Sequence, residues 1–219
     1  MLIVCLLSCS YLLGALPFGL WIAYRLKGID IRDVGSGNIG STNVGRVCGP
    51  VAGAVVMILD ALKGLLPPIA ATKLGLDSRF VILAALLAIV GHNFSVFLKF
   101  KGGKGISTSA GALFGASFSV GVIAAAIFTT SVLLLRWVSV GSILAAMSLP
   151  FAMHYFYPGD IYRLEFSIVA CVMALFKHKS NIGRLLKGTE PRVSLTRRKS
   201  SPAEPSVPKS EDQDGADER

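Results

Sequence analysis

The stretch LIVCLLSCSYLLGALPFGLWIAY, residues 2–24, carries no charged side chain. A helix needs about 20 mostly apolar residues to cross the hydrocarbon core of a bilayer. Residues 80–98 and 106–135 likewise lack Lys, Arg, Asp and Glu. The whole chain of 219 residues is 53% hydrophobic and only 16% charged, which is too apolar for a soluble domain of this size. These stretches predict an all-α protein, a polytopic bundle of transmembrane helices.

The first stretch has the position of a signal peptide but not its composition. No basic residue precedes it, no small-residue cleavage site stands out, and further apolar stretches follow it. We therefore expect it to be an uncleaved first membrane helix.

Basic residues set the expected orientation, because loops rich in Lys and Arg stay in the cytoplasm. They gather in three segments, residues 25–46, 99–104 and 177–199, whereas the other connections carry few. The three segments should therefore share the cytoplasmic side. This arrangement places the N-terminus outside and the C-terminus in the cytoplasm.

The number of crossings follows from this parity. Residues 47–71 and 80–98 form one out-and-back pair, and three apolar stretches follow, at 106–135, 137–157 and 166–176. Three crossings there would put the basic tail outside, so one stretch must be broken or fused with a neighbour. As one helix, residues 106–135 would be about 45 Å long, against a core of about 30 Å. We expect five to seven membrane helices, and the sequence leaves five and seven open.

Two parts of the chain differ in character. Residues 1–199 contain all the apolar stretches and form the expected membrane domain. Residues 200–219 are polar, rich in proline and increasingly acidic. Such a composition buries too little apolar surface to order itself, so it predicts a disordered cytoplasmic tail.

The segment VGSGNIGSTNVGR, residues 34–46, contains the dinucleotide-binding pattern G-x-G-x-x-G. A dinucleotide site needs a strand before the glycines and a parallel sheet around them, whereas here a membrane helix precedes them. The nucleotide interpretation is therefore disfavoured. The segment nevertheless offers many small hydrogen-bonding groups, and Arg46 supplies a rigid fork for phosphate. A helix starting near Val44 and capped by Thr42 or Asn43 is equally compatible, since a capped N-terminus also binds anions.

A second segment, GHNFSVFLKFKGGKGIST at residues 91–108, combines lysines with glycines. Glycines leave the backbone N–H groups exposed, and such groups can form an anion-binding concavity. A helix starting near Ile106 would add the positive partial charge of its N-terminus. The pattern is not a Walker loop, because G-x-x-x-x-G-K-[ST] is not satisfied. A plain basic loop that meets acidic headgroups would explain the lysines but not the glycines. Phosphate binding explains both.

Metal chemistry finds no support in the sequence. The four cysteines include no C-x-x-C pair, and the three histidines show no H-E-x-x-H grouping. We expect no metal site, no disulfide framework, no cofactor and no nucleic-acid partner.

Three segments together resemble a known family: GSGNIGSTNVGR, GHNFSVFLKFKGGKGISTSAG and HKSNIGRLLKGTE, at residues 35–46, 91–111 and 178–190. In order and spacing they resemble the signature motifs of the bacterial acyl-phosphate:glycerol-3-phosphate acyltransferases of the PlsY type. The similarity spans about residues 1–190. We call the three segments motifs 1, 2 and 3.

The resemblance implies a reaction and a setting. Family members transfer a fatty acyl group from acyl phosphate to the 1-hydroxyl of glycerol 3-phosphate, which yields lysophosphatidate and inorganic phosphate in the first step of phospholipid synthesis. They lie in the bacterial cytoplasmic (inner) membrane as multi-pass proteins. The implied partners are the two substrates, the lipid bilayer and the soluble enzyme that makes acyl phosphate.

The resemblance also implies catalytic residues. Ser36 and Arg46 of motif 1 and His178 and Asn181 of motif 3 match active-site groups. His92 is either a base for the acceptor hydroxyl or a hydrogen-bonded residue at a helix end, and the sequence leaves both open.

Substrate contacts and one structural residue follow from the same match. Lys104 is the expected centre of the glycerol 3-phosphate site, and Glu190 matches a glutamate that we expect to support the structure. The expected binding residues are Gly37, Asn38, Gly40, Thr42, Asn43, Lys101, Gly102, Gly103, Lys104, Gly105, Ser107 and Thr108.

Two other functions compete with this one. A transporter of a phosphorylated solute also needs basic, glycine-rich elements, but near the bilayer midplane. A thioester-dependent acyltransferase would carry H-x-x-x-x-D, whereas the fifth residues after the three histidines are Phe97, Gly159 and Gly183. Acyl phosphate is an activated mixed anhydride, so positioning and neutralisation of the leaving phosphate supply much of the acceleration. The absence of a G-x-S-x-G elbow agrees with this chemistry.

Two ionisable residues fall inside an apolar stretch. Asp60 and Lys63 stand at i and i+3, and such groups are costly in a membrane unless they are paired. We expect a structural ion pair, while a contribution to the polar floor of the site stays open. The segment DALKGLLPP, residues 60–68, is expected to break its helix.

Overall fold

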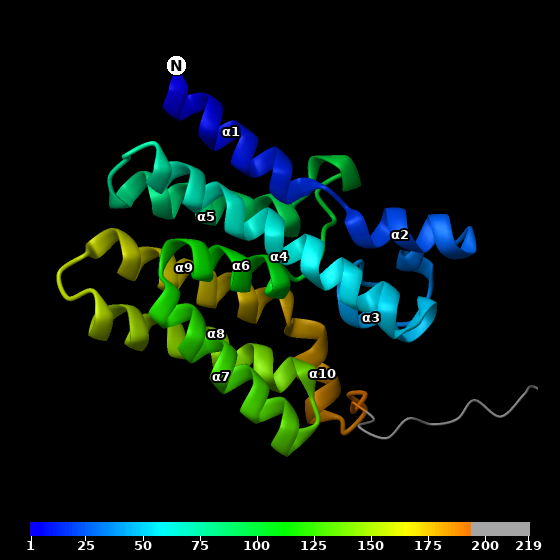
Figure 1. Cartoon of the computed structure of the whole chain (residues 1–219). Coiled ribbons are helices and arrows are strands. Elements are labelled where there is room, and N and C mark those ends of the chain that lie inside the picture. The colour runs from blue at the N-terminus through cyan, green and yellow to red at the C-terminus, as the bar shows by residue number, and fades with distance from the viewer. Residues whose placement is uncertain (194–219) are drawn as a thin grey trace, which may run out of the picture.

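The computed structural model describes residues 1–193, and within that range it contains helices and no strand. Figure 1 shows the arrangement of these helices. The expected tail at 200–219 lies outside the described residues. The α-helices are α1 (Leu2–Ala15), α2 (Phe18–Lys27), α3 (Ser41–Cys48), α4 (Pro50–Lys73), α5 (Ser78–Asn93), α6 (Ile106–Ala116), α7 (Phe118–Leu135), α8 (Val138–Phe156), α9 (Ile161–Lys177) and α10 (Lys179–Leu186). Two short 3₁₀ turns, η1 (Ile31–Asp33) and η2 (Val96–Leu98), lie in the loops.

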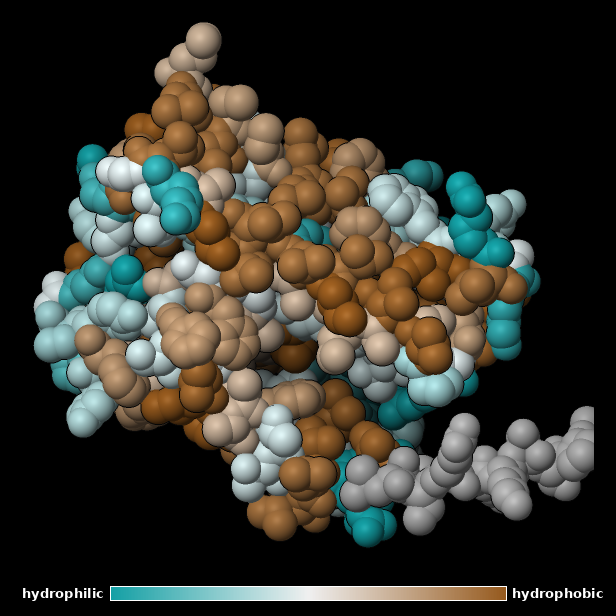
Figure 2. All heavy atoms as spheres, in the orientation of Figure 1, coloured by the Kyte–Doolittle hydropathy of each residue, from teal (hydrophilic) through white to brown (hydrophobic). Residues whose placement is uncertain are grey.

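Five segments in the described range are long and apolar enough to cross a membrane. They are Leu2–Lys27, Pro50–Lys73, Ser78–Leu98, Phe118–Leu135 and Val138–Phe156. Apolar side chains cover the middle of the face shown in Figure 2, and hydrophilic ones gather toward its ends. The prediction of an all-α bundle with five to seven membrane helices is confirmed. The orientation of the termini stays a prediction.

The long apolar stretch at 106–135 is broken, which is one of the two alternatives, a break or a fusion, that the sequence left open for the three stretches. The chain leaves helical geometry at Ser117, which ends α6 and begins α7 with φ −158° and ψ 88°. With 11 residues, α6 extends only about 16 Å, so it does not cross the bilayer alone. The expected stretch at 166–176 belongs to the longer α9, which has 17 residues and reaches about 26 Å.

The first membrane segment is interrupted between α1 and α2. Pro17 follows the break, and the carbonyls of Ala15 and Leu16 lack helical partners there. Two side chains from other helices serve them: Ser95 Oγ donates to the Ala15 carbonyl at 2.6 Å, and Lys63 Nζ donates to the Leu16 carbonyl at 2.8 Å. A break at membrane depth requires such replacement bonds, because lipid offers none.

Helix α4 crosses α6 at very close range, through glycines. A Cβ on Gly64 would lie 2.0 Å from the carbonyl oxygen of Thr108, and one on Gly111 would lie 1.9 Å from that of Ala61. Small residues of this kind let membrane helices approach closely. The expected break within 60–68 is wrong, because α4 continues through its prolines to Lys73. The packing against α6 holds this part of the helix in place, and membrane helices tolerate proline.

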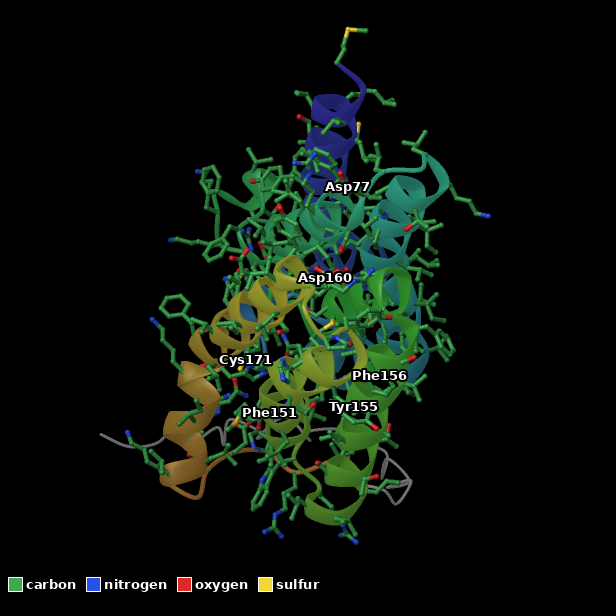
Figure 3. The ribbon with its side chains drawn as sticks, turned by 90° about the vertical axis from the view of Figure 1, so that its left-hand side faces the viewer. Asp77, Phe151, Tyr155, Phe156, Asp160 and Cys171 are labelled. Atoms are coloured by element: carbon green, nitrogen blue, oxygen red, sulfur yellow. The ribbon has the colours of Figure 1, made fainter. Side chains whose placement is uncertain are left out.

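The bundle has two different ends. At one end, the α4–α5 and α8–α9 turns meet, where Ser78 Oγ donates to Asp160 Oδ2 at 2.6 Å. Figure 3 looks onto this side and shows Asp77 and Asp160 near one another, with Phe151 and Tyr155 lower in the view. At the other end lie α2, α3 and α10 (Figure 1). All three motifs therefore lie at the end of the bundle away from these turns.

Candidate active site

Motif 1 folds around the buried side chain of Asn43. Its Oδ1 accepts a hydrogen bond from the backbone N–H of Ser36 at 2.9 Å. Its Nδ2 lies 2.9–3.2 Å from three carbonyl oxygens, those of Ile31, Val34 and Asn38. Because both ends of the amide are used within the loop, Asn43 shapes the loop that presents Ser36.

Helix α3 begins earlier than the sequence suggested. It starts at Ser41 with Gly40 as its N-cap, and no side chain caps it. The expected start near Val44 with a Thr42 or Asn43 cap is therefore wrong. The side chain of Asn43 is used by the preceding loop instead, which leaves the first turn of α3 without a side-chain cap.

Motif 2 spans the end of α5, the loop that follows it and the start of α6, which begins at Ile106 as predicted. The backbone N–H of Gly103 donates to the carbonyl of His92 at 3.1 Å. A Cβ on Gly102 would lie 2.0 Å from that same carbonyl oxygen, and one on Gly103 would lie 2.2 Å from His92 Nε2. These glycines therefore let the loop pack on the end of α5 and carry Lys104 toward the neighbouring helices.

Lys104 joins motif 2 to motif 3. Its ammonium donates to Asn181 Oδ1, and Asn181 Nδ2 donates to Glu190 Oε1 at 2.6 Å. Glu190 Oε2 accepts from Arg184 Nε at 2.7 Å, and the Glu190 carboxylate is nearly buried. Glu190 is thus linked to Lys104 through Asn181, and its supporting role stays a prediction.

The electrostatics of this cluster lower the pKa of Lys104. Burial is the main cause, the neighbouring Arg184 and Arg46 act in the same direction, and Glu190 opposes them, so that the pKa falls to about 8. Burial also raises the pKa of Glu190, but hydrogen bonds from Asn181 and Arg184 outweigh it and hold that pKa below its usual value. The cluster thus contains a lysine whose charge an incoming anion would stabilise.

His178 is buried at the end of α9. Its Nδ1 lies 2.8 Å from the carbonyl oxygen of Ala174, which only accepts hydrogen bonds, so Nδ1 carries the proton. Burial lowers the pKa of His178, the hydrogen bond to Ala174 partly opposes this, and the charge of Lys104 lowers it further. The ring is therefore neutral at pH 7 and Nε2 holds a lone pair.

A cavity of about 940 Å³ collects these groups. The predicted site residues in its wall are Ser36, Asn38, Gly40, Thr42, Asn43, Arg46, His92, Lys104, Gly105, Ser107, His178, Asn181 and Glu190. Five predicted residues do not line it: Gly37, Lys101, Gly102, Gly103 and Thr108. Of these, Lys101 is exposed, and Thr108 is buried with its carbonyl against α4.

The cavity continues as an apolar arm between α6, α7, α8 and α9. On α7 its wall extends between positions 121 and 132, which lie about 16 Å apart along the helix. Small residues leave the room for it: Gly121, Ala124, Ala125, Ala145, Ala146, Ala170 and Ala174. The cavity thus has a polar chamber, with the cations Arg46, Lys104 and Arg184 in its wall, that opens into the apolar arm.

Sequence reasoning missed several residues of the wall. Ser139 and Ser142 line it from α8, where their only signal is a pair of serines three positions apart in an apolar helix. Arg184 lines it beside Asn181. Asp60 was considered from the sequence as an ion-pair partner or as part of the polar floor of the site. It has both positions, because Lys63 Nζ lies 2.8 Å from Asp60 Oδ1 and Asp60 lines the cavity from α4.

Known proteins are similar to this chain in sequence. The family model described as glycerol-3-phosphate acyltransferase matches residues 3–188. The glycerol-3-phosphate acyltransferase of Desulforamulus reducens is 46% identical over 184 residues, which is 84% of this chain and 92% of that protein. The enzyme of the same name from Thermotoga petrophila is 40% identical over 189 residues, 86% of this chain and 95% of that protein.

Solved structures agree with the fold. The crystal structure of PlsY (YgiH), an integral membrane glycerol 3-phosphate acyltransferase, in its glycerol 3-phosphate form has a TM-score of 0.83 to this chain at 38% identity. The match covers 89% of this chain and 96% of that one. The lysophosphatidic acid form has a TM-score of 0.80 at 37% identity, with the same coverage. The chain thus belongs to the glycerol-3-phosphate acyltransferase family and is an integral membrane acyltransferase.

Proposed function

We propose that this protein transfers a fatty acyl group from acyl phosphate to the 1-hydroxyl of glycerol 3-phosphate. The products are lysophosphatidate and inorganic phosphate, and the reaction is the first step of phospholipid synthesis. The observation that carries the proposal is the shape of the cavity, in which a chamber with Arg46, Lys104 and Arg184 opens into an apolar arm. The cations of the chamber suit the phosphate groups of the two substrates, and the apolar arm suits a fatty acyl chain.

Phosphate binding is assigned to the polar chamber. Lys104 is held by Asn181, and its pKa of about 8 reflects burial among other cations, so an arriving dianion relieves repulsion. Arg46 adds a planar fork suited to phosphate oxygens. Gly102 and Gly103 act indirectly in this proposal, since they set the position of Lys104.

The reaction needs little from the protein beyond positioning and charge. The acceptor oxygen attacks the carbonyl carbon of acyl phosphate, the bond to the phosphate oxygen breaks, and the phosphate leaves with the electron pair. The proton of the hydroxyl ends on the released phosphate. Ser36, His92, His178 and Asn181 are the proposed groups around the reacting atoms, and the cations neutralise the leaving group.

The apolar arm is the proposed site of the acyl chain. Each methylene that moves from water into such a slot contributes about 0.8 kcal/mol. The arm begins next to His178 and Asn181, which puts the carbonyl end of a bound chain at the polar chamber.

We place the protein in the bacterial inner membrane with the motifs on the cytoplasmic side, the N-terminus outside and the C-terminus inside. The supporting facts are the basic residues of the motif loops and the occurrence of all three motifs at one end of the bundle. A soluble enzyme that makes acyl phosphate would then meet the same face. A cysteine introduced at Ser36 should react only with a reagent that reaches the inner side, and labelling from outside contradicts this topology.

The test is a comparison of acyl donors on purified protein. Glycerol 3-phosphate should be acylated from palmitoyl phosphate without added metal or nucleotide, and far more slowly from palmitoyl-CoA. Equal rates from the two donors would refute the proposed donor while leaving the family assignment intact.

A further inference from the structure

The segment that follows α10, orange in Figure 1, lies against the turn between α7 and α8. Trp137 Nε1–H donates a hydrogen bond to the carbonyl oxygen of Glu190 at 3.2 Å. The backbone N–H of Val193 donates to the carbonyl oxygen of Arg136 at 2.7 Å. The guanidinium carbon of Arg192 lies 4.6 Å from the centre of the Trp137 ring. Two hydrogen bonds and a cation–π contact therefore hold the segment to this turn.

The turn is short and offers a fixed support. Arg136 and Trp137 are the two residues between α7 and α8, and Trp137 is the N-cap of α8. Arg136 has φ 63°, a left-handed conformation that residues other than glycine seldom adopt, and its N–H closes α7 by donating to the Val132 carbonyl at 2.9 Å. Because the connection is so short, the two long helices set the position of the indole ring.

Glu190, in contrast, lies past the end of its own helix. Helix α10 ends at Leu186, so the backbone of Glu190 lies outside its ladder of hydrogen bonds. Glu190 and the following Pro191 are nevertheless part of the cavity wall. The hydrogen bond from Trp137 thus attaches this part of the wall to α8, one of the membrane segments.

The side chain of Glu190 carries this attachment into the polar chamber. Its Oε1 accepts from Asn181 Nδ2 at 2.6 Å, and its Oε2 accepts from Arg184 Nε at 2.7 Å. Asn181 in turn accepts from the ammonium of Lys104. Trp137 itself does not line the cavity, so its link to Lys104 passes through Glu190 and Asn181.

We propose that Trp137 is a positioning residue for the phosphate site. Its indole N–H holds the main chain of Glu190, and this keeps the Glu190 carboxylate on Asn181 and Arg184. The inference rests on the proposed function in taking Lys104 as the group that binds glycerol 3-phosphate. Trp137 touches no substrate in this assignment and acts on binding through the carboxylate alone.

The charges around Lys104 give the proposal a measurable consequence. Arg46 of α3 and Arg184 of α10 lower the pKa of Lys104, Glu190 raises it, and the nearby His178 of α9 is neutral at pH 7. If the carboxylate moves away, the two arginines act unopposed and the pKa of Lys104 falls below its value of about 8. The ammonium then loses its proton at a lower pH, and binding of a phosphate dianion weakens there.

The first test measures the affinity for glycerol 3-phosphate against pH by calorimetry, without an acyl donor. Trp137→Phe removes the indole N–H but keeps an aromatic ring for Arg192. We expect Kd at pH 7 to rise about 3- to 10-fold, as for the loss of one hydrogen bond, and the alkaline weakening to begin at a lower pH. Trp21→Phe makes the same change at the other tryptophan, which is 47% exposed on α2, and should leave both unchanged.

Two outcomes of this test would overturn the proposal. One is a pH profile of Trp137→Phe that coincides with that of the unsubstituted protein. The other is a lower unfolding temperature in detergent with the same pH profile, which would mark Trp137 as purely structural. Because no acyl donor is present, neither outcome depends on the identity of the donor. If Lys104→Ala also binds as tightly as the unsubstituted protein, the phosphate site lies elsewhere, and the inference fails together with its premise.

The second test asks whether Trp137 acts through Glu190. Glu190→Gln alone should move the alkaline weakening to lower pH, because it removes the charge that raises the pKa of Lys104. Adding Trp137→Phe to Glu190→Gln should cause no further move, since no carboxylate is left to displace, and such non-additivity is the mark of residues that act in series. A further shift in the double variant, equal to that of Trp137→Phe alone, would contradict the assignment.

Discussion

The ammonium of Lys104 donates a hydrogen bond to the side-chain amide of Asn181, 77 positions later in the chain. This contact joins the glycine-rich loop after α5 to α10, the short helix that follows α9. Through Asn181 it also reaches Glu190 and Arg184. The proposed glycerol 3-phosphate site depends on this connection.

Removing the Lys104 charge should weaken glycerol 3-phosphate binding strongly. A charge-assisted bond to phosphate contributes about 1.5–3 kcal/mol, so Lys104→Ala should raise KM roughly 10- to 150-fold. Lys27→Ala is the control, since Lys27 is exposed at the end of α2 and does not line the cavity. The measurement is the acylation rate against glycerol 3-phosphate concentration, on protein shown to be folded in detergent. Similar KM values for the two variants would mean that the loop charge only sets topology.

The pKa of Lys104 predicts a loss of activity in alkali. With a pKa of about 8 in the free protein, Lys104 is charged below that pH and loses its proton above it. The value of kcat/KM for glycerol 3-phosphate should therefore be level near pH 7 and fall above about pH 8. Lys104→Arg should remove this fall whatever its absolute rate, because guanidinium stays charged throughout the range. A wild-type profile that stays level to pH 9.5 would contradict the assignment.

Glu190 should act through the residues that it holds. Glu190→Gln keeps an oxygen for Asn181 but loses the ion pair with Arg184, whereas Glu190→Ala loses both contacts. We expect the alanine variant to have the lower unfolding temperature in detergent and the higher KM, with the glutamine variant between it and the wild type. Each lost charged hydrogen bond costs about 1.5–3 kcal/mol. If both variants unfold at the wild-type temperature, the network does not support the site.

The preference for acyl donors of a given chain length should depend on the small residues of the apolar arm. Ala146→Leu adds bulk to the wall of the arm from α8. Because each excluded methylene costs about 0.8 kcal/mol, or about fourfold, palmitoyl phosphate should lose more activity than octanoyl phosphate. Leu144→Phe adds bulk to an exposed position of the same helix and should leave the ratio of the two rates unchanged. Equal losses from both donors with Ala146→Leu would place the acyl chain elsewhere.

Much of this architecture could be predicted from the sequence because its signals are local. Apolar stretches predict membrane helices wherever they occur, and the glycine-rich, basic segments indicate a phosphate site. The parity of the basic loops even required a break or fusion among three stretches. The location of the break at Ser117 depends on the packing of α6 and α7, which no local sequence pattern reveals.

The differences between the sequence-based expectations and the structure arise from contacts between segments that are distant in the chain. Asn43 offers the same hydrogen-bonding groups to a ligand or to its own loop, and only the folded loop decides between them. Gly102 and Gly103 suit an anion as well as they suit the end of α5, and the structure uses them for α5. The close crossing of α4 and α6 likewise overrides the prolines that predicted a break.

The most direct test of the central claim is the stoichiometry of the reaction with palmitoyl phosphate. Purified wild-type protein and its Lys104→Ala variant are given labelled glycerol 3-phosphate, and lysophosphatidate and inorganic phosphate are measured in the same samples. The two products should appear one to one, and both should decline together in the variant at low glycerol 3-phosphate. Phosphate release without lysophosphatidate, or an unchanged rate in the variant, would contradict the proposed transfer.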